Sequence, residues 1–134
     1  MSADEAELVA AAWQARDAAI CTYSGFAVGA ALRDSTGRVW TGANVENASY
    51  TLGLCAERVA IFAALTHGAR DFTHVVVATD TPRPTTPCGA CRQILVEFAR
   101  NAEVIMVTKQ GEPLRLGVTD LVPHAFDDAA LKGG

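Results

Sequence analysis

Two short stretches decide how this chain is interpreted: Cys55-Ala56-Glu57 at residues 55–57, and Pro87-Cys88-Gly89-Ala90-Cys91 at residues 87–91. Three thiols at this spacing can bind one zinc ion, and Glu57 is then not needed as a ligand. Three protein ligands leave a fourth coordination position for water, which distinguishes catalytic from structural zinc sites. A C-x-x-C pair alone also occurs in redox motifs, so the matched third cysteine upstream carries the argument. We predict one zinc ion per chain, bound by Cys55, Cys88 and Cys91, in a small zinc hydrolase.

Cys21, the remaining cysteine, leaves an alternative open. Its place between Ile20 and Thr22 favours a small buried apolar side chain. If Cys21 were instead a fourth zinc ligand, the closed four-cysteine site would make the chain a non-catalytic, zinc-stabilised binding module and not an enzyme.

Both ligand groups are expected to begin a helix, over residues 55–65 and 90–99. Helix N-termini carry partial positive charge and free N–H groups, which favour thiolate. Residues two apart on a helix point about 200° from each other, so Cys55 and Glu57 could not both face one ion from mid-helix. They can if Cys55 lies at the helix cap. We therefore expect the metal where two helix N-termini meet.

Three thiolates would leave the zinc site negatively charged, which weakens the metal as a Lewis acid. Arg58, three residues after Cys55, is the candidate to offset this charge by donating to a sulfur, and Gln93 is a second candidate. The alternative for Arg58 is a solvated helix arginine. Glu57 is left free to act as general acid and base.

The rest of the chain alternates between helix and strand patterns. A Ser-x-x-Glu capping box and apolar residues at helical spacing predict a first helix over residues 3–20. The predicted strands cover residues 26–32, 38–45, 73–78, 104–107 and 114–116, with a turn at 34–37, a proline-rich loop at 80–87 and a short last helix stopped by Pro123. We predict one α/β domain over residues 1–134, with its core at about 5–126 and a short tail at 127–134. Helices on both faces of a mixed five-stranded sheet would give three α-β-α layers.

Composition narrows the class of substrate and the compartment. The 134 residues carry a net charge of −4, so no basic surface for a nucleic-acid backbone is expected, and a small-molecule substrate is favoured. The acidic N-terminus does not resemble a signal peptide, and no apolar run reaches membrane-spanning length. Free cysteines favour the reducing cytoplasm.

Residues 23–31 (YSGFAVGAA), 44–50 (NVENASY), 55–58 (CAER) and 87–93 (PCGACRQ) together resemble the small homotetrameric zinc-dependent cytidine deaminases. The similarity runs from about residue 5 to Phe126. It implies a cytidine deaminase-like fold and hydrolysis of cytidine and 2′-deoxycytidine to uridine and 2′-deoxyuridine, with release of ammonia, in pyrimidine salvage. Glu57 would move a proton from the metal-bound water to base N3. Another aminated nucleoside or heterocycle remains an alternative substrate.

The resemblance also implies how the substrate is held. Phe26 would pack near the base and ribose, Asn44 and Glu46 would hydrogen-bond the ribose 3′-hydroxyl, and the Ala56 backbone would contact the base. The resemblance further implies a homotetramer with shared active sites, in which Phe126 would reach into a neighbouring subunit's site. The family often has proline where this chain has Thr22, on the loop that leads to Phe26.

Overall fold

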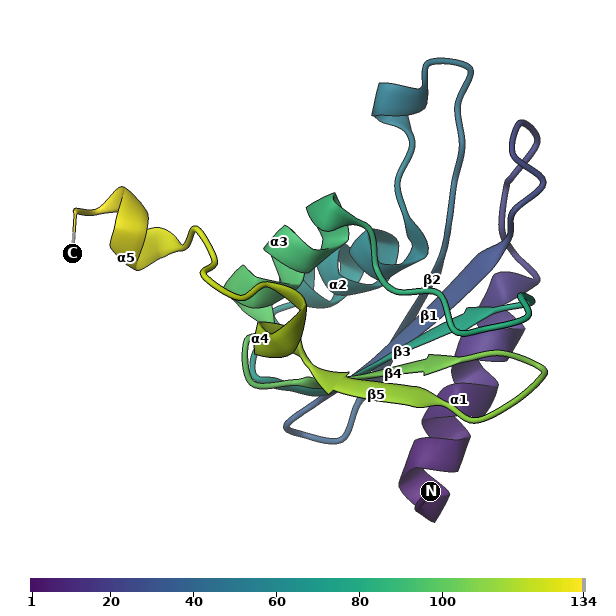
Figure 1. Ribbon diagram of the computed structural model, residues 1–134, viewed down its shortest axis with the longest axis horizontal. Helices are drawn as coiled ribbons and strands as arrows, with labels where there is room; N and C mark the ends of the chain where they lie inside the picture. The colour runs from purple at the N-terminus through teal and green to yellow at the C-terminus, as the bar shows by residue number, and fades with distance from the viewer. Residues whose placement is uncertain (134) are drawn as a thin grey trace.

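The structure, a computed structural model, describes residues 1–133 and is built on one five-stranded sheet in the order β2-β1-β3-β4-β5 (Figure 1). Strands β3 and β4 pair in parallel and all other neighbours pair antiparallel, so the sheet is mixed, as predicted. No helix within residues 1–133 combines the length and apolar character that crossing a membrane requires. The elements, in chain order, are α1 (Ala3–Arg16), β1 (Val28–Asp34), β2 (Val39–Ala43), the 3-10 turn η1 (Tyr50–Leu52), α2 (Ala56–Thr66), β3 (Phe72–Thr79), α3 (Gly89–Phe98), β4 (Glu103–Val107), β5 (Leu114–Gly117), α4 (Val118–Leu121) and α5 (Asp128–Leu131).

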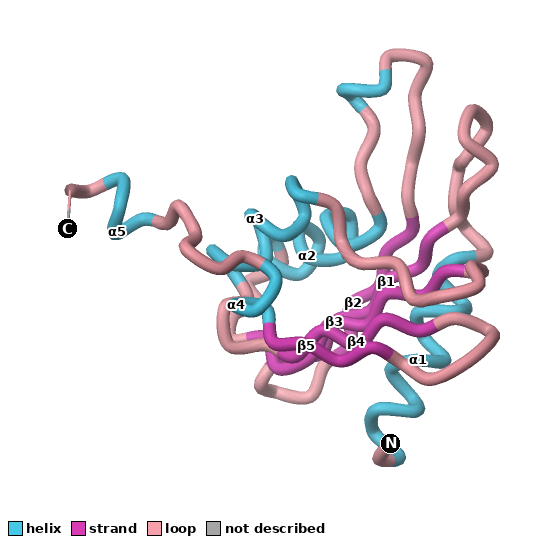
Figure 2. Tube along the Cα trace, in the orientation of Figure 1, coloured by secondary structure: helices cyan, strands magenta, loops and turns pink. Residues whose placement is uncertain are grey.

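Helices lie on both faces of the sheet, and this confirms the predicted three-layer α-β-α fold (Figure 2). Successive strand residues point to opposite faces. On β3, Val76 faces α1 and packs with Leu8 and Ala12, whereas Val75 and Val77 belong to the larger core under α2 and α3. Each strand of the sheet centre is therefore buried on both sides, which explains the continuous apolar runs of β3 and β4.

The first helix is shorter than predicted, because it ends at Arg16 and not at residue 20. Leu8 and Ala12 form its buried stripe, and Arg16 lies at the edge of that stripe, where its Nε donates to the Ala27 carbonyl (3.0 Å). Ile20 leaves the helical pattern because its backbone pairs with the chain around Val45: its N–H donates to the Asn44 carbonyl at 2.9 Å. The apolar side chain of Ile20 is 52% exposed and not part of the helix stripe.

Strands β1 and β2 are also shorter than predicted at the end that leads to the site. β1 begins at Val28 and not Phe26, and β2 ends at Ala43 and not Val45. Here the Asn44 side chain, and not a neighbouring strand, hydrogen-bonds the main chain around the start of β1. Its Oδ1 accepts from the Val28 N–H (2.9 Å) and its Nδ2 donates to the Phe26 carbonyl (2.8 Å). Residues 20–27 and 44–55 consequently leave the sheet as two protruding segments (Figure 1). The two segments lie next to each other where they leave the sheet, because Ile20 pairs with Val45 there.

Two glycines let the helices approach the sheet closely. A Cβ at Gly29 would lie 2.0 Å from the Ala12 carbonyl oxygen of α1, and a Cβ at Gly42 would lie 2.5 Å from the Ala60 nitrogen of α2. Both contacts are with backbone, so a larger residue would push a helix away from the sheet. The contact at Gly42 fixes the first half of α2, which carries site residues.

Candidate active site

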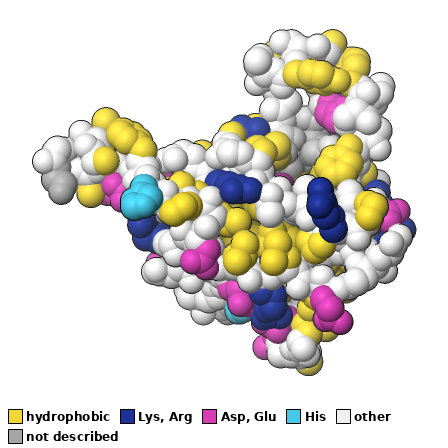
Figure 3. Space-filling view, in the orientation of Figure 1, with side chains coloured by type: hydrophobic (Ala, Val, Ile, Leu, Met, Phe, Trp, Pro, Cys, Tyr) yellow, Lys and Arg dark blue, Asp and Glu magenta, His cyan; other side chains and the backbone are white. Residues whose placement is uncertain are grey.

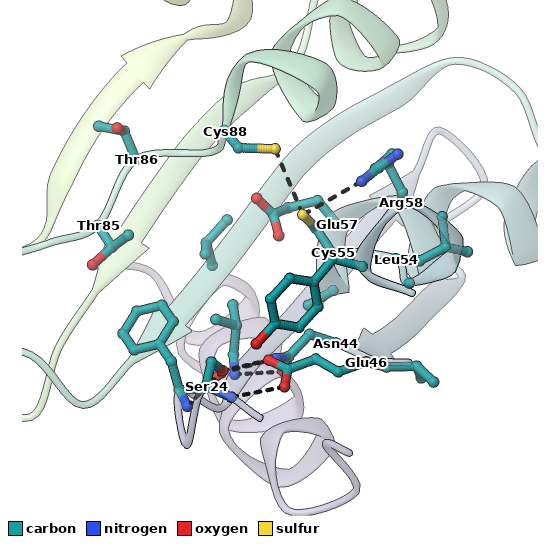
Figure 4. A pocket seen from close by; sticks show the side chains of 17 residues that line it. Ser24, Asn44, Glu46, Leu54, Cys55, Glu57, Arg58, Thr85, Thr86 and Cys88 are labelled. Carbon is teal, nitrogen blue, oxygen red and sulfur yellow. Dashed lines mark hydrogen bonds between the residues drawn. The ribbon is translucent and has the colours of Figure 1, made fainter. Parts of the chain in front are cut away.

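Three cysteines meet where two helices begin, as the sequence analysis expected. Cys55 is the N-cap of α2, Cys88 is the N-cap of α3, and Cys91 lies in the first turn of α3. Their sulfurs all lie within 4.8 Å of one another, and the Sγ atoms of Cys55 and Cys88 are 3.6 Å apart (Figure 4). Zinc–sulfur bonds of about 2.3 Å in a tetrahedron place two sulfurs about 3.8 Å apart. The three thiols therefore fit zinc.

The fourth cysteine does not join this group. Cys21 lies in the protruding segment after α1, and the thiol cluster of the described chain consists of Cys55, Cys88 and Cys91 alone. Its side chain is half-buried, and so less buried than the small apolar side chain that the sequence analysis favoured. The binding-module alternative required Cys21 beside the other three cysteines, and the structure contradicts that arrangement.

Arg58 lies against the thiols, as expected for a residue that offsets their charge. Its Nη2 donates to the Cys55 sulfur at 3.6 Å, and its Nε is buried with no hydrogen-bond partner in residues 1–133. A hydrogen bond from the Cys91 thiol, with a further one from Arg58, lowers the pKa of Cys55 to about 5. Sharing its proton with Cys55, together with burial, raises the pKa of Cys91. A metal binds the thiolate form of cysteine, so its binding here would release the protons that these thiols still carry.

Glu57 is a buried carboxyl beside these thiols. It follows Cys55 by two residues in the first turn of α2, is 4% exposed, and lies outside the group of potential metal ligands described above. Burial raises the pKa of Glu57 to about 7, because the charged carboxylate loses its hydration. A carboxyl with this pKa can both accept and release a proton near neutral pH.

A cavity of about 450 Å³ opens beside the thiols and Glu57. Four predicted substrate-contact residues line it together with the site residues: Phe26, Asn44, Glu46 and Ala56. Figure 4 places Ser24, Asn44 and Glu46 at one end and Cys55, Cys88 and Glu57 at the other. The cavity thus has a polar end, formed by Ser24, Asn44 and Glu46, and a metal end, formed by two of the thiols and Glu57, with apolar walls between them. The polar end is the one that would hold the ribose implied by the sequence resemblance.

Several lining residues were not predicted as site residues. Thr85 and Thr86 come from the loop before Cys88, and Val77 from the end of β3. The two threonines directly precede Pro87-Cys88, so their closeness to a ligand group was a usable signal. Val77 looks only like a core residue in the sequence, because its lining role depends on how the sheet and loop meet. Tyr50 also lines the cavity and makes an edge contact with Tyr23.

Gln93 and Phe126 contact each other and not the thiols or the cavity. The Gln93 Nε2 donates to the Phe126 carbonyl at 2.7 Å, so its amide is engaged away from the sulfurs here, and its role as the second candidate to offset the thiolate charge stays a prediction. Phe126 is 59% exposed on the chain that follows α4 and is not among the residues lining the cavity of its own chain. Figure 3 shows apolar side chains both on this C-terminal extension and on the protruding segment above the sheet.

Comparisons with known proteins agree with this geometry. Residues 1–108 match the family described as "Cytidine and deoxycytidylate deaminase zinc-binding region". A cytidine deaminase of Halalkalibacterium halodurans is 46% identical over 92% of this chain and 94% of its own. The 1.6 Å crystal structure of cytidine deaminase from Burkholderia pseudomallei is 44% identical, with a TM-score of 0.88 over 94% of this chain and 100% of that chain. That from Mycobacterium tuberculosis is 37% identical, with a TM-score of 0.79 over 93% and 98%. With three thiols placed to hold zinc and a buried glutamate beside them, this chain belongs to the cytidine and deoxycytidylate deaminase zinc-binding family.

Proposed function

We propose that this protein is a cytidine deaminase that hydrolyses cytidine and 2′-deoxycytidine to uridine and 2′-deoxyuridine, releasing ammonia. The observation that carries the proposal is one cavity lined by Glu57, Cys55 and Cys88 at one end and by Asn44 and Glu46 at the other. The buried Cys91 sulfur lies within 4.8 Å of the other two sulfurs, behind this lining. A nucleoside has the matching polarity, with a reactive amidine in its base and hydroxyls on its sugar.

Cys55, Cys88 and Cys91 would hold the zinc ion, which supplies a Lewis acid that lowers the pKa of a water molecule. Glu57 would take one proton from this water and deliver it to base N3 as the water oxygen adds to C4. It would then take the remaining proton from the new C4 hydroxyl and pass it to the amine, which leaves as ammonia while the C4 carbonyl forms. A pKa of about 7 suits both directions of transfer. Arg58 would offset part of the thiolate charge through its contact with the Cys55 sulfur.

The far end of the cavity would hold the sugar. Asn44 and Glu46 would bind the ribose 3′-hydroxyl, while Phe26 and the Ala56 backbone would contact the base. Binding at the sugar would align the base for attack, so these remote contacts should support turnover as well as affinity.

We further propose a homotetramer in which Phe126 completes the site of a neighbouring subunit. Phe126 is 59% exposed, and Tyr50 and Leu52 on the protruding segment are 65% and 73% exposed. Such apolar surface favours burial against other copies.

Four free cysteines favour the reducing cytoplasm, where nucleoside deamination would serve pyrimidine salvage. One domain over residues 1–134 with its core at 5–126 stays a prediction.

The test is ammonia release from a panel of nucleosides by the zinc-loaded protein. We expect efficient turnover of cytidine and 2′-deoxycytidine. Cytosine should react poorly, because the polar groups at the sugar end would lose their partner. CMP should also react poorly, because the cavity lining offers one arginine, Arg58, and it is engaged at the thiols. Turnover of cytosine at the rate of cytidine would overturn the nucleoside assignment. Faster turnover of another aminated heterocycle would show that this compound, and not cytidine, is the substrate.

A further inference from the structure

Glu46 is held by one short stretch of the other protruding segment. Its Oε1 accepts hydrogen bonds from the Tyr23 and Ser24 N–H groups, both at 3.0 Å. Its Oε2 accepts from the Ser24 hydroxyl. Glu46 is half-buried on a segment that has left the sheet, so these bonds fix a long side chain that is otherwise free to rotate.

The same Ser24 hydroxyl also contacts the backbone of Phe26, because its oxygen accepts from the Phe26 N–H at 3.0 Å. The turn that allows this is closed by a hydrogen bond from the Gly25 N–H to the Cys21 carbonyl (2.8 Å), with Gly25 at a φ of +68°. One hydroxyl thus joins two residues of the cavity wall that come from separate segments, and it lies in the wall itself (Figure 4).

The contacts also set the chemistry of the carboxyl group. The hydrogen bonds from the Ser24 side chain and backbone hold the pKa of Glu46 below its ordinary value. A carboxylate that stays ionised can only accept hydrogen bonds, so the ligand group opposite must be a donor. A sugar hydroxyl meets this requirement, whereas a hydrogen atom or an ester at the same carbon does not.

We propose that Ser24 is a positioning residue for the sugar, which fixes the Glu46 carboxylate in the geometry that binds the 3′-hydroxyl. This inference rests on the proposed function. Ser24 acts through Glu46 and takes no part in the proton transfer at Glu57.

The test compares two substrates that differ only at the 3′ carbon, 2′-deoxycytidine and 2′,3′-dideoxycytidine, in the wild-type protein and in Ser24→Ala. A hydrogen bond to a charged group is lost, so we expect kcat/KM for 2′-deoxycytidine to fall about tenfold or more. For the dideoxy compound, which lacks the hydroxyl, we expect a fall of less than about threefold. Ser24→Thr keeps a hydroxyl and should retain most of the wild-type preference. In a Glu46→Ala background, Ser24→Ala should add little.

Three results would overturn the inference. Equal losses for both substrates in Ser24→Ala would make Ser24 a general structural residue. An unchanged preference would mean that the backbone N–H groups alone position Glu46. A large additional loss in the Glu46→Ala background would show that Ser24 acts by another route. Failure of the wild-type protein to deaminate any cytidine nucleoside would instead refute the proposed function itself, and with it the sugar role of Ser24.

Discussion

The two ends of the cavity are built in different ways. At the metal end, Cys91 is fully buried, Glu57 is 4% exposed, and the three thiols are held by the starts of two helices. At the sugar end, Phe26 is 42% exposed and Glu46 depends on hydrogen bonds from a segment more than 20 residues away in the chain. The metal end is therefore fixed by local helix geometry, and the sugar end by contacts between two protruding segments.

This difference shows at which end of the cavity the fold can tolerate an amino-acid substitution. At the metal end a substitution leaves a buried charge or thiol without its partner, which is costly in a low-dielectric environment. At the sugar end most groups face water, so a substitution changes recognition and leaves the fold nearly unaffected. Asn44 is the exception, since both ends of its amide are hydrogen-bonded to the main chain.

The largest effect is expected at the buried thiol. Cys91→Ala should lose its zinc and all measurable deamination, because two remaining thiols cannot hold the ion as tightly as three. Zinc per chain measured by elemental analysis, alongside ammonia release, checks this. Cys21→Ala is the matched control and should keep one zinc ion. Zinc retention in Cys91→Ala together with zinc loss in Cys21→Ala would show that the ligand set is wrong.

A smaller effect is expected for Arg58→Ala, which removes the charge that lies against the Cys55 sulfur. Groups that support metal ligands typically contribute about 10- to 100-fold, so we expect kcat to fall by roughly that factor while KM changes by less than about threefold. Steady-state kinetics of the zinc-loaded variant measure both. The control is Arg83→Ala, an exposed arginine on the loop before Cys88. An unchanged kcat in Arg58→Ala would mean that the two helix N-termini alone offset the thiolates.

At the sugar end we expect substitution of Asn44 to lower the stability of the fold and substitution of Glu46 to leave it nearly unchanged. Asn44→Ala should lower the free energy of unfolding by about 1–3 kcal/mol, because the Val28 N–H and the Phe26 carbonyl lose their partner. Glu46→Ala should leave the stability nearly unchanged while it removes the preference for a 3′-hydroxyl. Chemical denaturation of both variants tests the pair, and equal destabilisation would show that Glu46 also supports the fold.

The smallest effect within a single chain is expected for Phe126→Ala. An exposed side chain contributes little to the protomer, so the midpoint of unfolding of the isolated chain should hardly move. If Phe126 completes a neighbour's site, KM for cytidine should rise several-fold in the assembly. Light scattering that gives a 14.1 kDa species still deaminating cytidine efficiently would contradict the shared site.

The metal end was predictable from sequence, because its chemistry is encoded in short motifs. Cys55 and Cys88 cap helices whose starts follow from local pattern, so the meeting of two N-termini could be inferred from spacing. The sugar end was predicted only through resemblance. The role of Ser24 was missed because it depends on a contact with Glu46, 22 residues away, that no local pattern records. The end of the first helix was misplaced for the same reason, since Ile20 pairs with a distant segment.

Glu57→Gln tests the central claim most directly, because it changes the proton-transfer group and preserves its shape. Zinc content and cytidine deamination are measured on the same sample. We expect one zinc ion per chain, an unchanged fold by circular dichroism, and a loss of kcat of at least about 10²–10⁴-fold. Near-normal deamination by the zinc-loaded variant would contradict the account, because the buried carboxyl beside the thiols would then take no part in the reaction.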